Sequence, residues 1–195
     1  NEIAKDERIT VEELEARLEP IRQILSSARE ARIHPSKDDK VLADWNGLMI
    51  AAFAKAAQAF DRPDYAEAAL RASAFVMGTM RRADGRLAQR YRDGEAGLTA
   101  HLDDYAFMIW GLIELYEATS ETRHLIEALS LNRDMITHFW DDTNGGFYFT
   151  ADDAEELIAR QKETYDGAIP SGNSVAMLNL VRLGRFTGDA DLLKK

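Results

Sequence analysis

A two-helix unit appears three times in this sequence and constrains the fold more than any other feature. In each unit a polar, acid-containing segment runs into an almost wholly apolar helix, and a short turn connects that helix to a second, charged one. The three units open at residues 44–50, 102–107 and 170–175. A unit of this kind cannot bury its apolar face alone and must stack on its neighbours. The repeat therefore predicts that the acid-bearing helix starts lie close together.

The first helix of each unit has the composition of a buried helix. Between Leu48 and Phe60 only Lys55 and Gln58 are polar, and a helix that is apolar nearly all round is buried on all sides. Two further inner helices are expected at residues 105–119 and 174–186. Charged outer helices are expected at about 64–80 and 123–140, with a third beginning at Ala190.

A separate amphipathic helix precedes the repeated units. Thr10 opens it with a capping box to Glu13. Pro20 lies inside the apolar pattern of this helix and should kink or restart it, because proline lacks the backbone N–H and clashes with the preceding turn. The helix is expected to be peripheral.

The connections between the helices alternate in length. Turns within a unit are about three residues long, which is typical of an αα-hairpin. Residues 81–100 and 141–171 form long connections, each with a glycine-marked piece of strand character, at residues 85–91 and 145–149. The units are offset by roughly 60 to 70 residues, whereas common helical solenoids repeat at about 34 to 47. The long repeat favours an all-α fold, a closed (α/α) toroid of helical hairpins.

The chain is expected to form one partial toroid domain over residues 1–195. Its expected parts are a leading amphipathic helix at 1–33, a first hairpin and loop at 34–101, a second hairpin and loop at 102–171, and the start of a third hairpin at 172–195.

Composition excludes several classes of function. A net charge of −10 argues against nucleic acid, because few groups could neutralise a row of phosphates. The absence of cysteine excludes disulfides and thiolate metal sites within the chain. The longest apolar runs fall short of the roughly 18 residues that a membrane span needs, and no signal segment opens the chain. A cytoplasmic protein is expected, and Asn1 in place of Met predicts a fragment of a longer chain.

No metal or cofactor is expected. Residues 142–146 resemble a calcium loop, but the glycine falls one position early and no closing ligand follows. Residues 166–173 match neither the phosphate-binding loop nor the dinucleotide fingerprint.

Carboxylates recur at the starts of the inner helices. Asp39 and Asp44 precede the first, Asp103 and Asp104 begin the second, and Asp166 precedes the third. Each could be only a cap, because Asp is favoured at the N-cap and complements the helix dipole. One cap per helix suffices, however, and two of the units carry pairs. A carboxylate pair across a pocket is the equipment of glycoside hydrolysis. Since adjacent residues point about 100° apart on a helix, the pair should join Asp39 or Asp44 to Asp103 or Asp104.

A histidine and two aromatic residues extend this set. His101 lies just before the second pair of acids and could act as the general base of a sugar epimerase, although a lone loop histidine is often only a hydrogen-bonding group. Trp45 and Tyr105 begin inner helices and offer flat faces for stacking on a sugar ring. The other expected substrate-binding residues are Asn46, Arg92, Asp166 and Asn173.

Three segments carry a resemblance to a known family. His34-Pro35 with residues 38–50, residues 102–106 and residues 166–174 closely resemble motifs of the spermatogenesis-associated, thioredoxin-domain-containing protein family, in the expected order. The resemblance implies a six-hairpin (α/α) toroid like that of N-acylglucosamine 2-epimerases and several glycosidases, of which this chain holds about half. It also implies a thioredoxin-like domain as an N-terminal partner in the full-length protein. No redox activity is carried over, because this chain has no cysteine. Family members vary at residues 43–44, so the resemblance favours Asp39 over Asp44.

The leading hypothesis is a carbohydrate-processing or carbohydrate-binding domain, glycoside hydrolase-like or sugar 2-epimerase-like, with a sugar as ligand. Asp39, Asp103, Asp104 and His101 are the expected catalytic residues. The alternative is a non-catalytic toroid that serves as a scaffold for proteins or domains, and exposed inner helices would favour self-association. An enzyme should have an open cavity lined by unpaired acids, whereas a scaffold should use those acids as helix caps.

Overall fold

The structure is a computed structural model that describes residues 2–155 and 158–195. Its contacts divide the chain into two units, Asn1–Asp39 and Lys40–Lys195. The boundary falls after Asp39 and not after residue 33, because residues 33–40 form an exposed segment without helix or strand that follows the leading helix.

The first unit contains two helices. The short helix α1 (Glu2–Asp6) was not predicted, whereas α2 (Val11–Glu30) begins at the predicted capping box. The Thr10 hydroxyl accepts from the Glu13 N–H at 3.1 Å, and the Glu13 carboxylate accepts from the Thr10 N–H at 2.9 Å. Pro20 lies inside α2, which continues through it, so the predicted restart is wrong.

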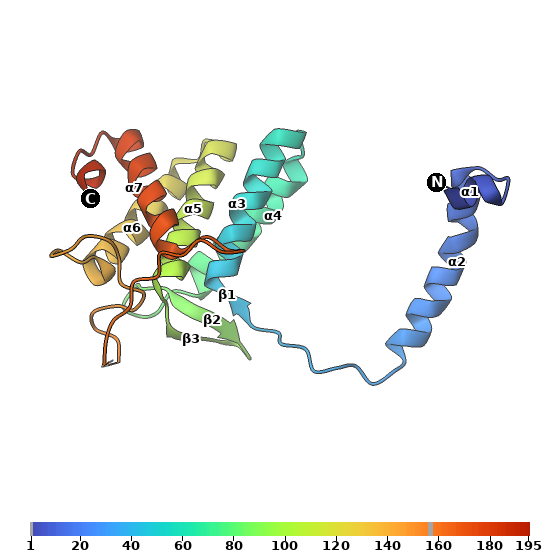
Figure 1. Ribbon diagram of the computed structural model, residues 1–195, viewed down its shortest axis with the longest axis horizontal. Coiled ribbons are helices and arrows are strands. Elements are labelled where there is room, and N and C mark those ends of the chain that lie inside the picture. The colour runs from blue at the N-terminus through green and yellow to red at the C-terminus, as the bar shows by residue number, and fades with distance from the viewer. Residues whose placement is uncertain (1, 156–157) are drawn as a thin grey trace. The chain divides into compact units, whose positions relative to one another are not determined.

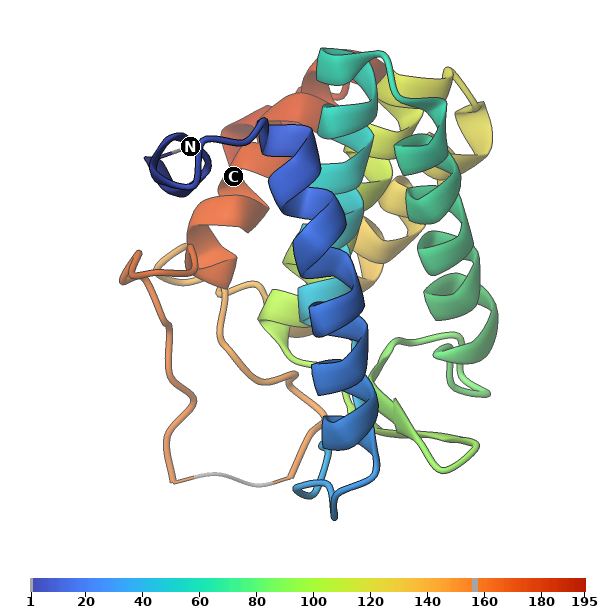
Figure 2. The same ribbon diagram turned by 90° about the vertical axis from the view of Figure 1, so that its right-hand side faces the viewer.

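In the second unit three inner helices lie side by side with their N-termini at one end (Figure 1). They are α3 (Ala43–Phe60), α5 (Leu102–Thr119) and α7 (Gly172–Thr187). The outer helix α4 (Pro63–Thr79) packs on α3 and α5, and α6 (Thr122–Phe139) packs on α5 (Figure 2). The five predicted helices of the repeat are therefore confirmed. The third outer helix is not, since a short 3-10 helix, Leu192–Lys194, follows α7 instead.

The two best-packed inner helices approach each other through glycine. A Cβ atom at Gly47 on α3 would lie 2.4 Å from the carbonyl carbon of Phe107 on α5. A Cβ atom at Gly111 on α5 would lie 2.8 Å from the carbonyl oxygen of Gly47. Any larger residue would push the two backbones apart, because main-chain atoms cannot rotate out of the way as a side chain can.

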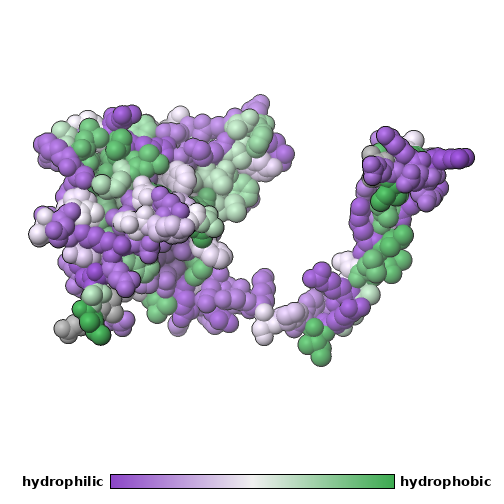
Figure 3. Space-filling model, in the orientation of Figure 1, coloured by the Kyte–Doolittle hydropathy of each residue, from purple (hydrophilic) through white to green (hydrophobic). Residues whose placement is uncertain are grey.

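The expectation that the inner helices are buried on all sides holds for α5 but is wrong for α3. Leu112 and Ile113 of α5 are fully buried, whereas Trp45 and Met49 of α3 are 60% and 54% exposed. The reason is that α5 lies between α3 and α7, while α3 packs mainly on α4 and α5 and leaves one flank open. Exposed apolar side chains also gather over α7 (Figure 3), namely Met177, Leu178, Val181 and Phe186.

A buried carboxylate joins the three inner helices halfway along their length. Glu114 on α5 is 1% exposed, and its Oε1 atom accepts from Lys55 on α3 at 3.2 Å and from Arg182 on α7 at 2.6 Å. Burial alone would raise the pKa of Glu114, but the bonds from Arg182, Trp110 and Lys55 outweigh it and hold that pKa below the ordinary value. The acid is therefore held as a carboxylate that fixes neighbouring helices.

A three-stranded antiparallel sheet lies at the end where the inner helices begin (Figure 1). Its strands are β1 (Val41–Leu42), β2 (Ala88–Arg92) and β3 (Glu95–Thr99), with Leu42 opposite Arg90 and Arg90 opposite Gly97. β2 overlaps the predicted strand piece at residues 85–91. The second predicted piece, residues 145–149, forms only an isolated bridge between Trp140 and Phe147. Among the described residues no helix is both long and apolar enough to cross a membrane.

Candidate active site at the start of the inner helices

Asp104 joins the first turns of two inner helices. Its Oδ1 atom accepts from the backbone N–H of Asp44, at the start of α3, at 3.1 Å. Its Oδ2 atom accepts from the backbone N–H of His101, just before α5, at 2.7 Å. The residue is 2% exposed, and burial raises the pKa of Asp104 to about 8 although both N–H groups oppose the shift. Asp104 is thus the helix cap of α5 and also a link to α3.

Asp103, the neighbouring acid, is not used in this way. It is half-buried beside the start of α7, where a Cβ atom on Gly172 would lie 2.1 Å from its Oδ1 atom. That buried Oδ1 atom has no hydrogen-bond partner by geometry among the described residues. Burial raises the pKa of Asp103, the negative charges of Asp44 and Glu163 raise it further, and the nearby Gly172 N–H offsets part of the shift. A raised pKa in a partly buried acid is characteristic of functional sites.

Asp44 lies in the same cluster, and its pKa is raised as well. Its Oδ1 atom accepts from the Trp45 N–H at 2.7 Å. Burial raises the pKa of Asp44, while the Trp45 N–H and the charge of His101 lower it. The cluster therefore contains two half-buried acids and a histidine, gathered from the starts of α3 and α5.

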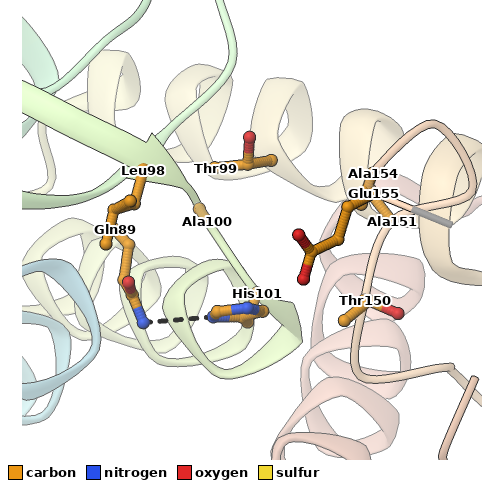
Figure 4. A pocket seen from close by; sticks show the side chains of 9 residues that line it. All are labelled: Gln89, Leu98, Thr99, Ala100, His101, Thr150, Ala151, Ala154 and Glu155. Carbon is orange, nitrogen blue, oxygen red and sulfur yellow. Dashed lines mark hydrogen bonds between the residues drawn. The ribbon is translucent and has the colours of Figure 1, made fainter. Parts of the chain in front are cut away.

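His101 connects this cluster to a pocket. Its ring stacks on Phe149 with centroids 4.6 Å apart and planes 9° apart, and its Nδ1 atom lies 3.1 Å from the Gln89 amide nitrogen (Figure 4). Burial lowers the pKa of His101, against the attraction of Asp44. The imidazole is therefore mainly neutral at neutral pH.

The pocket beside His101 has a volume of about 290 Å³. Polar groups from three segments line it: Gln89 on β2, Thr99 on β3, and Thr150 and Glu155 in the connection between α6 and α7. In Figure 4 the Glu155 carboxylate reaches into the space between His101 and Thr150. The Thr150 hydroxyl is buried without a hydrogen-bond partner among the described residues.

A second, apolar hollow of about 430 Å³ lies along α3. Its lining consists of Trp45, Leu48, Met49, Ala52 and Ile169. Trp45 directly follows Asp44 in the chain, so this apolar wall begins at the acid cluster. The predicted place of Trp45, at the open start of an inner helix, agrees with its 60% exposure.

Other residues predicted for the site have different surroundings. Asp39 is the last residue of the first unit. Tyr105 is 1% exposed and its hydroxyl accepts from the Leu87 N–H at 3.2 Å. Its expected role as a stacking wall is therefore wrong, because the ring is closed inside the core. Arg92 lies at the exposed end of β2, with its Nε atom 3.4 Å from Asp93.

Three predicted substrate-binding residues use their polar atoms within the protein. The Asn46 amide donates to the Leu42 carbonyl at 2.7 Å. Asp166 accepts from the Ser171 N–H and the Ser174 hydroxyl at the start of α7. Asn173 accepts from the Phe147 N–H and donates to the Phe147 and Glu163 carbonyls. These bonds hold the long connection against α7.

Three residues that line the pocket were not predicted. Gln89, Thr150 and Glu155 come from long connections without a recognisable motif, and only the length of those connections pointed to a functional role.

One group of described residues has the spacing of metal ligands, His138, Asp152 and Asp153. These residues already pair within the protein, because His138 lies 2.8 Å from Asp152 and Arg86 lies 2.5 Å from Asp153. We therefore interpret the group as an ion-pair network.

Comparison with known proteins identifies relatives of the whole chain, although no family model matches it. Human spermatogenesis-associated protein 20 is 36% identical over 195 residues, which cover 91% of this chain and 25% of the human protein. The mouse protein of the same name is 36% identical over 96% of this chain and 25% of its own length. The chain is a homologue of spermatogenesis-associated protein 20. It spans about a quarter of the length of these relatives.

Solved structures with the same fold come from carbohydrate enzymes. Cellobiose 2-epimerase from Bacillus thermoamylovorans matches with a TM-score of 0.66 at 18% identity, over 82% of this chain and 43% of the epimerase chain. A family 76 α-mannanase from Bacteroides thetaiotaomicron matches with a TM-score of 0.65 at 18% identity, over 82% of this chain and 44% of its own. At this identity the likeness shows the fold alone. The chain has the fold of an (α/α) toroid with about half of the ring present, as the sequence predicted.

Proposed function

We propose that the start of the inner helices carries a carbohydrate-processing site of the glycoside hydrolase type. The observation that carries the proposal is the pairing of two half-buried acids, Asp44 and Asp103, beside a histidine that lines a pocket. The fold adds support, because the structural neighbours are carbohydrate epimerases and glycoside hydrolases.

The electrostatics assign different roles to the two acids. The charge of Asp44 raises the pKa of Asp103, so Asp103 holds its proton more tightly. Burial raises the pKa of Asp44 as well, but the Trp45 N–H opposes this shift. Asp103 is therefore the proton donor and Asp44 the carboxylate that activates water. Two carboxyl groups whose surroundings separate their pKa values are the usual basis for such a division.

The reaction would follow from this division. Asp103 gives its proton to the glycosidic oxygen as the bond from that oxygen to the anomeric carbon breaks. A water molecule forms the new bond to the anomeric carbon, and Asp44 takes the proton that the water releases. Return of a proton to Asp103 and loss of one from Asp44 restore the site.

His101 is better suited to donate a hydrogen bond than to abstract a proton. The Gln89 amide nitrogen faces Nδ1, so the neutral ring carries its proton on Nε2. A base that removes a proton next to a carbonyl, as epimerisation requires, would need a free ring nitrogen. This observation favours hydrolysis over epimerisation, with His101 orienting a sugar hydroxyl.

The surroundings also favour an uncharged sugar. Among the described residues that line the pocket beside His101, none is Lys or Arg, whereas Glu155 is one of them. The negative charges of Asp44 and Glu163 act on Asp103, and that of Asp44 acts on His101. An anionic sugar, such as a phosphate or a uronate, would be repelled by these carboxylates. Trp45 and the apolar hollow behind it suit the flat apolar face of a neutral sugar ring.

A sugar panel tests the proposal. The protein at its full natural length would be incubated with neutral, amino, phosphorylated and acidic oligosaccharides, and released reducing ends would be measured alongside deuterium exchange at the sugar C–H positions. We expect release from a neutral oligosaccharide, with loss in Asp103→Asn and Asp44→Asn. Exchange without release would favour the epimerase alternative. Neither activity nor binding across the panel would favour the non-catalytic scaffold.

A further inference from the structure

Asp104 differs from the two proposed reacting acids in every contact that the structure records. It is 2% exposed, against the half-buried Asp103 beside it, and it does not line either hollow described above. Both of its oxygens accept backbone N–H groups, one from each of two separate segments. Because the side chain is also buried, neither oxygen is exposed to a substrate.

The two N–H groups belong to the residues that matter most to the proposed site. One is that of Asp44, the proposed water-activating carboxylate, and the other is that of His101, which lines the pocket. A single side chain therefore sets the distance between the backbone of Asp44 and the backbone of His101. These two residues are 57 positions apart in the sequence (101 − 44), and α3 and α5 each meet Asp104 at their first turn.

We infer that Asp104 is a positioning residue that holds Asp44 and His101 in register across the starts of α3 and α5. The inference rests on the proposed function for its catalytic consequence, while the link itself rests only on the geometry. An ordinary helix cap would accept N–H groups of its own helix alone. Asp104 instead uses one oxygen to accept an N–H group of the neighbouring helix α3, at whose start the proposed reacting acid Asp44 lies.

The link predicts how substitutions at this position behave. In Asp104→Asn one oxygen becomes an NH₂ group that faces a backbone N–H, so one of the two bonds is lost. Asp104→Glu keeps the carboxyl group but moves it by one methylene. Because a misplacement of about 1 Å at a reacting group can cost roughly 100-fold in rate, we expect kcat to fall by up to about 100-fold in both variants. KM should change little, since no substrate contact is removed.

The matched control is Asp141→Asn. Asp141 also accepts two backbone N–H groups, from Thr143 and Asn144, but both belong to its own turn. If Asp104 acted only through general stability, the two Asn variants would have the same effect on the site. We expect instead that the NMR-measured pKa of His101 and the amide exchange rates of Asp44 and His101 change in Asp104→Asn and remain unchanged in Asp141→Asn.

A measurement on the unmodified protein covers the case in which the Asp104 variants do not fold. The NMR chemical shifts of the Asp44 and His101 amide protons should change with pH at the same midpoint, that of the Asp104 carboxyl group. This midpoint should be separate from those of the Asp44 and Asp103 side chains. The inference would be overturned if the chemical shifts of the two amide protons changed with different pH midpoints. It would also be overturned if the pKa and the amide exchange rate of His101 were unchanged in a folded Asp104→Asn variant. Failure of the sugar panel would remove the proposed function but leave this shared titration intact, so the two outcomes are distinguishable.

Discussion

The close approach of α3 and α5 gives the sharpest prediction for stability. In Gly47→Ala the new methyl group would lie 2.4 Å from the Phe107 carbonyl carbon and 2.6 Å from its oxygen, against about 3.5 Å for a favourable contact between carbon atoms. The two helices must separate by about 1 Å. That movement also breaks the 3.1 Å bond from the Asp44 N–H to Asp104, because it leaves the range of a hydrogen bond.

The magnitude follows from three terms. Overpacking against an unyielding neighbour costs about 1–3 kcal/mol, and the lost hydrogen bond costs about 1 kcal/mol. The higher helix propensity of alanine returns about 1 kcal/mol. We therefore expect the free energy of unfolding to fall by about 1–3 kcal/mol, measured by urea denaturation followed by circular dichroism.

Gly78 on α4 provides the matched control. A Cβ atom there would meet nothing within 4 Å, so Gly78→Ala should raise the free energy of unfolding by up to about 1 kcal/mol through helix propensity alone. The reasoning would be refuted if both substitutions changed stability in the same direction, or if Gly47→Ala left it unchanged.

Four further predictions follow from individual contacts. Because the pKa of Asp104 is raised from 3.8 to about 8, the folded state holds this proton more tightly than the unfolded state. The contribution of Asp104 to stability should therefore be fully present below about pH 4 and be lost as the pH rises to 8, by up to about 1.4 kcal/mol per unit. Asp104→Asn should remove this part of the pH dependence in urea denaturation. Lys162 lowers the pKa of Asp141 from a distance of 2.6 Å, so Lys162→Met should raise the NMR-measured pKa of Asp141. Asn173→Ala removes three hydrogen bonds to the connection between α6 and α7, and limited proteolysis within residues 141–171 should become faster. The exposed apolar side chains of α3 and α7 favour self-association, and a strictly monomeric result in light scattering would contradict this.

The hairpin architecture could be predicted because it depends on local patterns. The apolar inner helices and the three-residue turns both lie within short stretches of sequence. The turns share a feature that the sequence signals only once: α3, α5 and α7 are followed by Asp61, Ser120 and Gly188, all with positive φ. Glycine is the usual residue for that conformation, and only the last of these ends carries one. The ends of α3 and α5 were predicted instead from the residues at which the apolar pattern stops. Asp93 and Gly94, which both have positive φ, form the turn between β2 and β3.

The roles of the acids could not be predicted, because they depend on contacts between helices. Asp103 and Asp104 are identical residues at adjacent positions, and the sequence offers no reason to separate them. The rotation of α5 against its neighbours decides the matter, since it turns Asp104 toward the first turn of α3 and Asp103 toward Gly172 on α7. Asp44 was ranked below Asp39 because family members vary at residues 43–44, and the sequence alone does not show that the backbone N–H of Asp44 bonds to Asp104.

The adjacent acids suggest why a cap and a reacting group need not be alternatives at a helix start. A lone acid that capped α5 would have both oxygens occupied, as Asp104 has. With two adjacent acids, Asp104 makes the capping bonds and Asp103 does not. Asp103 keeps an oxygen without a partner among the described residues, and its burial and the neighbouring charges favour its protonated form. A similar separation of roles holds between α3 and α5. Asp104 accepts the backbone N–H of Asp44, so the side chain of Asp44 remains able to interact with His101. A pair of acids at one helix start is thus more informative about function than either acid alone, because helix capping accounts for only one of them.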